Sequence, residues 1–124
     1  MAIGAQAVPR LHEPEGPGHR VKAVGVTQRV SVDPAYGERR DCLDQAWTRF
    51  LAACGLLPVL LPNVSQAALA LCDAVSVSGL VLTGGNDLST LGGDAPERDI
   101  TENALLDLAE RRGLPCWAFV EACK

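Results

Sequence analysis

The 124-residue chain is predicted to form one α/β domain around a parallel sheet. Four short apolar runs have the composition of buried strands, and three stretches of helical periodicity lie between them. Strands that alternate with helices of about 10–15 residues indicate right-handed βαβ crossovers, which set consecutive strands parallel in one sheet. The hydrophobic content of 48% is ordinary for a globular domain.

The four apolar runs are short and rich in Val, Leu and Ala. The run over residues 21–27 is β-branched, as buried strands often are. Pro58 lies in the second run, where it suits the start of a strand or an edge position. Pro34 and Gly37 predict a loop between the first strand and the first helix. The expected strands are residues 21–27, 57–61, 78–83 and 114–120.

The helical stretches carry recognisable end signals. Asp41 is the expected N-cap of the first helix, and Gly55 ends it. Asn63 and Gln66 have the spacing of a capping box for the second helix, and Gly113 stops the third. The expected helices are residues 41–54, a stretch from the capping box to about residue 74, and residues 97–112. The apolar side of the third helix is expected to hold Ile100, Ala104, Leu105 and Leu108.

This element order predicts a flavodoxin-like, three-layer αβα fold. The four strands are expected in the order 2-1-3-4, with helices on both faces of the sheet. Ligands of such sheets bind beyond the carboxyl ends of the strands. The segments to consider for function are therefore residues 27–40, the loop that begins at Gly84, and the segment after Val120.

Composition excludes several function classes. The net charge of -4 and the absence of a basic stripe argue against a nucleic-acid partner. No apolar run is long enough to span a membrane, and residues 1–20 lack a secretory h-region. We expect residues 1–20 to form a flexible leader and the chain to be cytoplasmic. The five cysteines lack metal-type spacing, so neither a metal nor a cofactor is expected, and Cys42, Cys54 and Cys72 are interpreted as small buried residues.

The strand ends exclude several common α/β functions. Residues 28–31 follow the first strand without the glycines of a dinucleotide-binding turn, and no P-loop is present. The first and third strands close on Thr27 and Thr83, where a receiver domain needs acidic residues. Gly84 and Gly85 remain: a bare backbone after a strand can aim N–H groups at an anion, as an oxyanion hole requires. A tight turn without chemistry is the competing interpretation.

Several segments together resemble a known family. They are Val24-Gly25-Val26-Thr27-Gln28-Arg29, Arg40-Asp41, Leu43-Asp44-Gln45, Leu60-Leu61-Pro62-Asn63, Gly79-Leu80-Val81-Leu82-Thr83-Gly84-Gly85-Asn86-Asp87 and Arg98-Asp99-Ile100-Thr101-Glu102. The set resembles gamma-glutamyl-gamma-aminobutyrate hydrolase-like proteins, which are class I glutamine amidotransferase-like enzymes of the cysteine peptidase C26 type. The resemblance covers roughly residues 21–115.

The resemblance implies hydrolysis of a small-molecule γ-glutamyl amide by a Cys-His-Glu triad. The cysteine of these enzymes follows the fourth strand in a motif similar to L-G-V-C-R-G-M-Q. An oxyanion N–H would fall on Gly84 or Gly85, and Asn86 and Arg98 are the nearby polar groups expected to contact substrate. For Arg98 the alternative is an ordinary surface charge at the start of a helix.

The chain departs from this pattern after Pro115. Val120 occupies the nucleophile position, so no catalytic residue is assigned within the chain. Cys123 is rejected as a displaced nucleophile because the turn glycine and the following helix are missing. A one-base shift of the reading frame permits L-G-V-C-R-G-M-Q at every codon. We therefore expect a frameshift, with residues 21–124 forming an incomplete domain; a diverged tail is the alternative.

A chain without the triad is expected to be inactive, a fragment of a γ-glutamyl amide hydrolase. One alternative is a non-catalytic α/β binding module that uses the same strand-end crevice, and another is a purely structural domain. The fourth strand would form an exposed sheet edge with Trp117 and Phe119 near it. Such an edge makes self-association possible.

Overall fold

The computed structural model describes residues 21–84 and 95–119. The expected leader, residues 1–20, lies outside these ranges, as do Gly85, Asn86 and Val120. Among the described residues, no helix combines the length and apolar composition needed to cross a membrane.

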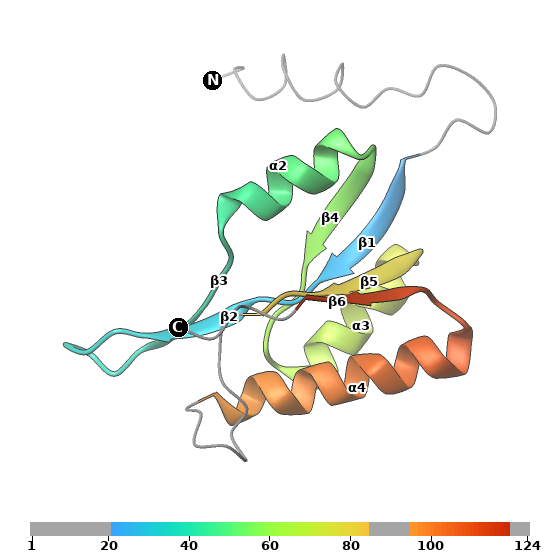
Figure 1. Cartoon of the computed structure of the whole chain (residues 1–124). Helices are drawn as coiled ribbons and strands as arrows, with labels where there is room; N and C mark the ends of the chain where they lie inside the picture. Colours follow the sequence, from blue (N-terminus) through green and yellow to red (C-terminus); the bar gives the residue numbers. More distant parts are fainter. Residues whose placement is uncertain (1–20, 85–94, 120–124) are drawn as a thin grey trace, which may run out of the picture.

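The described chain alternates strands and helices, with one additional hairpin near its start (Figure 1). The strands are β1 (Lys22–Val26), β2 (Arg29–Val32), β3 (Arg39–Cys42), β4 (Leu56–Leu60), β5 (Gly79–Leu82) and β6 (Cys116–Ala118). The helices are α2 (Gln45–Ala53), α3 (Ser65–Val75) and α4 (Pro96–Arg112).

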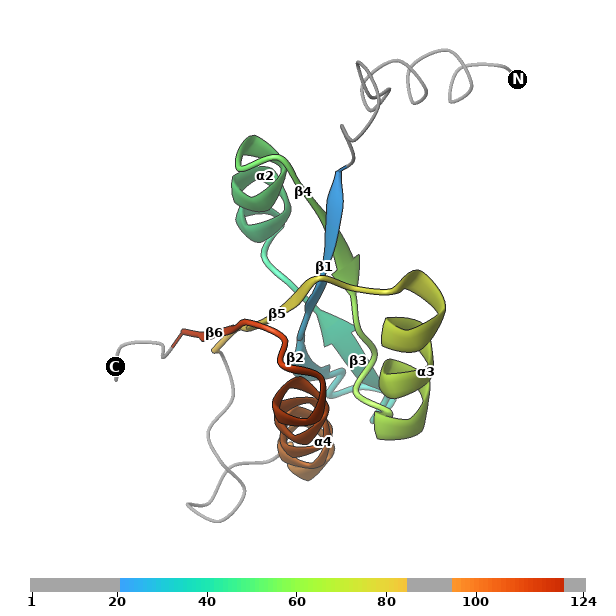
Figure 2. The same ribbon diagram turned by 90° about the vertical axis from the view of Figure 1, so that its right-hand side faces the viewer.

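The main sheet is parallel and has the strand order β4-β1-β5-β6. This is the expected order 2-1-3-4, so the flavodoxin-like prediction is confirmed. Helix α2 covers one face of the sheet, and α3 and α4 cover the other (Figure 2). The fourth strand is shorter than expected: β6 ends at Ala118 rather than at residue 120.

Two predicted helix starts are wrong. Helix α2 is capped by Asp44, whose Oδ1 accepts from the Ala46 N–H at 2.8 Å, because Asp41 belongs to strand β3. Helix α3 has Val64 at its N-cap without a side-chain hydrogen bond, so the capping box at Asn63 does not form. The Asn63 side chain bonds to other elements instead. The predicted stop of α4 is confirmed, since Gly113 is its left-handed C-cap with φ 65°.

The expected loop around Pro34 and Gly37 is the turn of a β-hairpin. Strands β2 and β3 pair antiparallel, from Arg29 with Cys42 to Val32 with Arg39. The turn is organised by Asp33, whose Oδ1 accepts from the backbone N–H groups of residues 35 and 36. Gly37 has φ 67°, a left-handed conformation that glycine adopts without strain.

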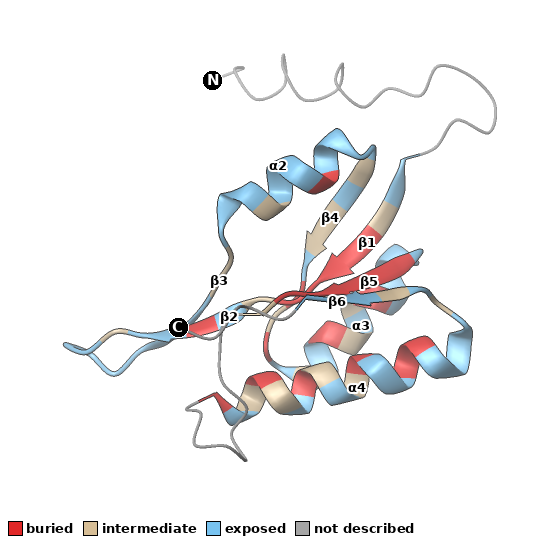
Figure 3. Cartoon of the chain, viewed as in Figure 1, coloured by how far each residue is buried: buried red, intermediate tan, exposed pale blue. Residues whose placement is uncertain are grey.

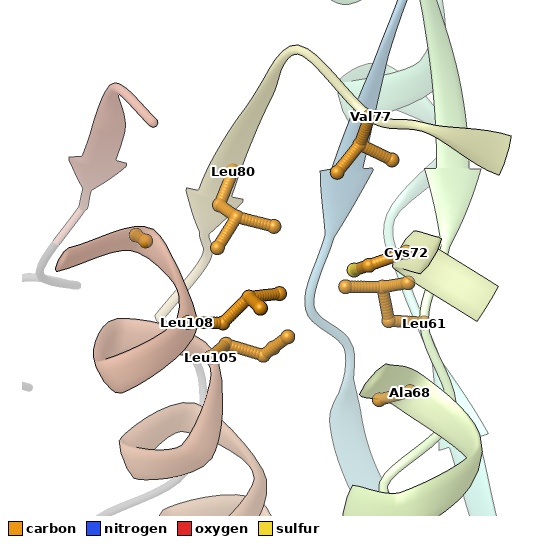
Figure 4. Packing of buried hydrophobic residues seen from close by; sticks show 8 residues of the cluster. Leu61, Ala68, Cys72, Val77, Leu80, Leu105 and Leu108 are labelled. Atoms are coloured by element: carbon orange, nitrogen blue, oxygen red, sulfur yellow. The ribbon is translucent and has the colours of Figure 1, made fainter. Parts of the chain in front are cut away.

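The larger core lies between the sheet and helices α3 and α4 (Figure 4). Its buried members are Leu61, Ala68, Cys72, Val77, Leu80, Leu105, Leu108 and Ala109. Gly25 allows this packing, since a Cβ there would lie 2.9 Å from both Leu61 Cδ1 and Leu80 Cδ2. Leu105 and Leu108 of α4 are buried as expected, whereas Ile100 is 60% exposed. Buried and exposed positions alternate along this helix, so that one side packs on the core and the other faces solvent (Figure 3).

A smaller core lies under α2, where Val24, Val26 and Val81 of the sheet meet Leu51. At the other end of this face the ring of Trp117 lies over Gly79, whose added Cβ would be 3.1 Å from the ring. The Trp47 and Phe119 rings meet edge to face at 4.9 Å. Cys54, expected to be buried, is exposed at the C-terminal end of α2.

Candidate functional site

The carboxyl ends of β1 and β5 form the topological switch point of the sheet. From β1 the chain crosses to β4 on one side, then returns to place β5 on the other side of β1. Crevices at such points are the usual ligand sites of open α/β sheets. Thr27 and Thr83 follow these two strands, and both side chains are buried.

Thr27 and Thr83 are joined by two hydrogen bonds across the switch point. The Thr83 backbone N–H donates to Thr27 Oγ1 at 2.9 Å. The Thr83 hydroxyl donates to the Thr27 carbonyl, also at 2.9 Å. Together these bonds continue the β1–β5 pairing by one residue and bring the two side chains face to face.

Helix α4 closes this pair into a ring of four residues. The Thr27 hydroxyl donates to Glu102 Oε2 at 3.0 Å, and Arg98 Nη2 lies 3.0 Å from the same oxygen. Arg98 Nη2 also donates to Thr83 Oγ1 at 3.3 Å. Thr27, Thr83, Arg98 and Glu102, which we call the threonine ring, thus tie α4 to both strand ends.

Burial dominates the electrostatics of the ring. Removal from water raises the pKa of the Glu102 carboxyl, although the positive charge of Arg98 and the Thr27 hydrogen bond oppose the shift. The negative charge of Asp99 adds to the increase. The pKa of the nearby Cys116 thiol is also raised, by burial and by the charge of Glu102.

Arg98 is therefore not a surface charge. Its side chain is 4% exposed, and its guanidinium faces the carboxyl ends of the strands. The alternative of an ordinary helix-start charge is wrong, because the first turn of α4 packs onto the sheet end. The contact of Arg98 with a substrate stays a prediction.

Gly84 directly follows the ring and is half-buried. The predicted site residues Gly85 and Asn86 lie outside the described residues. On the other side of β5, the Phe119 N–H donates to the Leu82 carbonyl at 2.9 Å. The last described residue of the chain is therefore adjacent to the strand that leads into Gly84, while Val120 lies outside the described residues.

A second polar cluster joins the end of β4 to the hairpin. Asn63 donates from Nδ2 to the Gln28 carbonyl and to Asp41 Oδ1, each at 3.0 Å. Its backbone N–H donates to Asp41 Oδ2 at 3.1 Å, and Gln28 Nε2 donates to the Leu61 carbonyl at 2.9 Å. Asp41, interpreted from sequence as a helix cap, thus fixes the segment after β4 to the hairpin.

The hairpin is also linked to the first turn of α4. Arg39 and Glu97 form a two-pronged ion pair, with Nε 2.6 Å from Oε2 and Nη2 3.0 Å from Oε1. The hydrogen bond from Arg39 lowers the pKa of the Glu97 carboxyl. Hairpin and ring consequently hold the same helix from two sides.

An apolar hollow of about 290 Å³ lies elsewhere, against α2. Asp44, Ala46, Trp47, Phe50 and Phe119 line it. It contains no member of the threonine ring and offers one carboxylate among apolar groups. The switch point, where buried polar groups converge, is therefore the candidate functional site.

Sequence reasoning named Arg98 and Gly84 but missed the ring. Thr27 and Thr83 were noted only as residues that exclude a receiver domain, and Glu102 only within a resembling segment. A usable signal existed, because Arg98 and Glu102 have i,i+4 spacing and both threonines end neighbouring strands.

A family model described as Peptidase C26 matches residues 22–122, a range that includes the whole threonine ring and the hairpin. No curated protein matches the chain.

Proposed function

Since the chain belongs to the Peptidase C26 family, we propose that it is the N-terminal part of a hydrolase that cleaves γ-glutamyl amides. In this proposal a thiolate attacks the amide carbonyl, and a Cys-His-Glu triad activates that thiolate and supplies the proton for the leaving amine. The present chain would supply the floor of the site and the oxyanion donors.

The observation that carries the proposal is the ordered end of β5. Both the backbone N–H and the hydroxyl of Thr83 are hydrogen-bonded to Thr27, and the glycine pair follows at once. An oxyanion hole needs N–H groups that are held in place before charge develops on the carbonyl oxygen. We propose that the backbone N–H of Gly84 or Gly85 is that donor.

We propose Asn86 and Arg98 as the groups that contact substrate. Asn86 is two residues beyond Gly84, and Arg98 carries a buried guanidinium at the strand end. A γ-glutamyl amide presents an α-carboxylate, and a guanidinium is suited to bind that group.

The frameshift hypothesis explains why Val120 stands at the position where the resembling enzymes carry their cysteine. Val120 follows Phe119, whose backbone bonds to Leu82 of β5. A cysteine at this point in a frame-restored chain would lie next to the strand that leads into the oxyanion loop. We propose that the reading frame is shifted by one base after Pro115.

The proposal is tested by sequencing the gene beyond codon 115 and by restoring its frame. The restored protein should hydrolyse γ-glutamyl-γ-aminobutyrate or a related γ-glutamyl amide, and replacing its recovered cysteine by alanine should abolish turnover. The 124-residue chain should be inactive, since lost positioning alone removes about 7–11 kcal/mol of catalysis. Turnover by the short chain that survives Cys123→Ala would refute the proposal.

The non-catalytic alternative makes a different prediction. A binding module should bind a γ-glutamyl amide without cleaving it in both the short and the frame-restored chains. Calorimetry measures the binding of a γ-glutamyl amide, and an assay of free glutamate separates the two cases, because only the hydrolase releases glutamate.

For the 124-residue chain alone we propose self-association at the β6 edge. Trp117 in this short strand is 48% exposed, and Phe119 directly after it is 45% exposed. Edge strands with apolar neighbours favour pairing with another chain. Sedimentation should show dimers or larger species that decrease in Phe119→Lys, whereas a strictly monomeric wild type would exclude this association.

A further inference from the structure

Glu102 is the acidic member of the threonine ring and does not contact the substrate in the proposed function. Glu102 lies on the second turn of α4, with its side chain 21% exposed, and reaches a strand end 75 residues earlier in the chain. Bringing a carboxylate out of water costs free energy, as its raised pKa indicates. A group held in this way despite its cost is a candidate for a specific function.

The hydrogen bond to Glu102 fixes the orientation of the Thr27 hydroxyl. A threonine hydroxyl has one hydrogen and two lone pairs. With its hydrogen directed to Glu102 Oε2 at 3.0 Å, Thr27 Oγ1 presents a lone pair to the Thr83 N–H at 2.9 Å. Without an acceptor on α4, this hydroxyl would be free to rotate, and the Thr83 N–H would lose a fixed partner.

Arg98 fixes the orientation of the Thr83 hydroxyl. Its Nη2 bonds to both Glu102 Oε2 and Thr83 Oγ1. Because a lone pair of Thr83 Oγ1 faces this donor, the Thr83 hydrogen remains directed at the Thr27 carbonyl. Every hydrogen bond of the ring therefore has a defined direction. The path from the Thr83 N–H through the Thr27 hydroxyl ends on the Glu102 carboxylate, and the Thr83 hydroxyl donates to the Thr27 carbonyl.

We propose that Glu102 is a positioning residue of the hydrolase: through Thr27 it fixes the Thr83 backbone, and thereby the start of the oxyanion loop at Gly84. The inference rests on the proposed function for its catalytic consequence, but the positioning itself is a property of the described chain. Oxyanion donors act mainly in the transition state. Loss of Glu102 should therefore lower kcat and leave KM nearly unchanged.

The first test uses the 124-residue chain and amide hydrogen exchange measured by NMR. Glu102→Met keeps an unbranched side chain of similar length and removes the acceptor. Protection of the Thr83 amide should fall about tenfold or more, while the Leu61 amide, which donates to Val26 on the other side of β1, should stay within about twofold of wild type. Glu110→Met, at an exposed position on the same helix, is the matched control and should leave both amides unchanged.

Two further results test whether Glu102 positions Thr83. Glu102→Gln keeps a neutral acceptor and should lower Thr83 protection severalfold, which preserves the test if the Met variant does not fold. Unchanged Thr83 protection in the folded Glu102 variants, or an equal loss in Glu110→Met, would overturn the proposal.

The second test uses the frame-restored enzyme. Glu102→Met should lower kcat about ten- to a hundredfold, with KM within about twofold. A rise in KM at constant kcat would make Glu102 a determinant of substrate binding and overturn the positioning role. If the restored wild type shows no hydrolysis, the proposed function fails, whereas the amide-exchange result still decides whether Glu102 positions Thr83.

Discussion

The Thr83 backbone N–H and hydroxyl both bond to Thr27, at 2.9 Å each, across the ends of two neighbouring parallel strands. Both residues are nearly inaccessible to solvent. Thr83 thus donates both hydrogen bonds of the pair and Thr27 accepts both, which leaves little freedom to the backbone that continues into Gly84. The stability of this strand end should depend on the hydroxyls rather than on side-chain volume.

Thr27→Val tests that dependence. Valine retains the shape of threonine but leaves the Thr83 N–H without its acceptor and Glu102 without a donor. The free energy of unfolding should decrease by about 1–3 kcal/mol, as expected when a buried donor loses its partner. Urea denaturation measures this change, and Thr27→Ser, which keeps the hydroxyl, should lose clearly less. Equal losses in both variants would mean that the methyl group, not the hydroxyl, matters.

The raised pKa of Glu102 predicts a pH dependence of stability. Because the folded protein binds this proton more tightly than the unfolded chain, the contribution of Glu102 is fully present below its ordinary pKa of 4.5. It is lost as the pH rises through the higher folded value. The stability of wild type minus that of Glu102→Gln should therefore decrease with rising pH over this window. A difference that increases with pH would show that Arg98 outweighs burial.

The Arg39–Glu97 ion pair should stabilise the protein only slightly. Its side chains are 44% and 30% exposed, so water and salt screen the attraction. A double-mutant cycle with Arg39→Ala and Glu97→Ala should give a coupling of about 0.2–1 kcal/mol at neutral pH. The lowered pKa of Glu97 means that this coupling is present above the ordinary pKa and disappears as the pH falls through the lower folded value.

The exposed pair Arg111–Asp107 is the matched control for that cycle. It lies within α4 and does not touch the hairpin, so its removal should leave hydrogen exchange in β2 and β3 unchanged. Removal of the Arg39–Glu97 pair should accelerate exchange there. Equal exchange in both double mutants would contradict a role of Glu97 in holding the hairpin.

Gly25→Ala should destabilise the larger core. The added Cβ would lie 2.9 Å from Leu61 Cδ1 and from Leu80 Cδ2, so one side chain directly after β4 and one on β5 must move. Overpacking of this kind costs about 1–3 kcal/mol. Leu61→Val in the same background removes a methylene group and should recover part of the loss, so that the two changes are less than additive. Strict additivity in thermal unfolding would exclude direct contact as the cause.

Helices and strands could be predicted from the sequence where their ends depend on residues that are close by in the chain. The apolar runs of β1, β4 and β5, and the left-handed glycine after α4, follow from composition and spacing alone. The strand order follows as well, because right-handed crossovers leave few arrangements for four parallel strands. The start of α2 was missed because Asp41 and Asp44 are equally good caps, and only the pairing of Asp41 in the hairpin distinguishes them.

The sequence by itself determined the parallel sheet, its strand order and the strand end at which function is expected. The strands follow from the hydrophobic periodicity of short segments, and their order follows from right-handed crossovers between consecutive strands. Tertiary structure alone decided the hairpin and the threonine ring. Thr27, Thr83 and Glu102 are separated by up to 75 residues, and a hydroxyl has no preferred partner until the fold brings one within about 3 Å. Hydrogen bonds between distant residues depend on packing, and packing is a property of the whole chain.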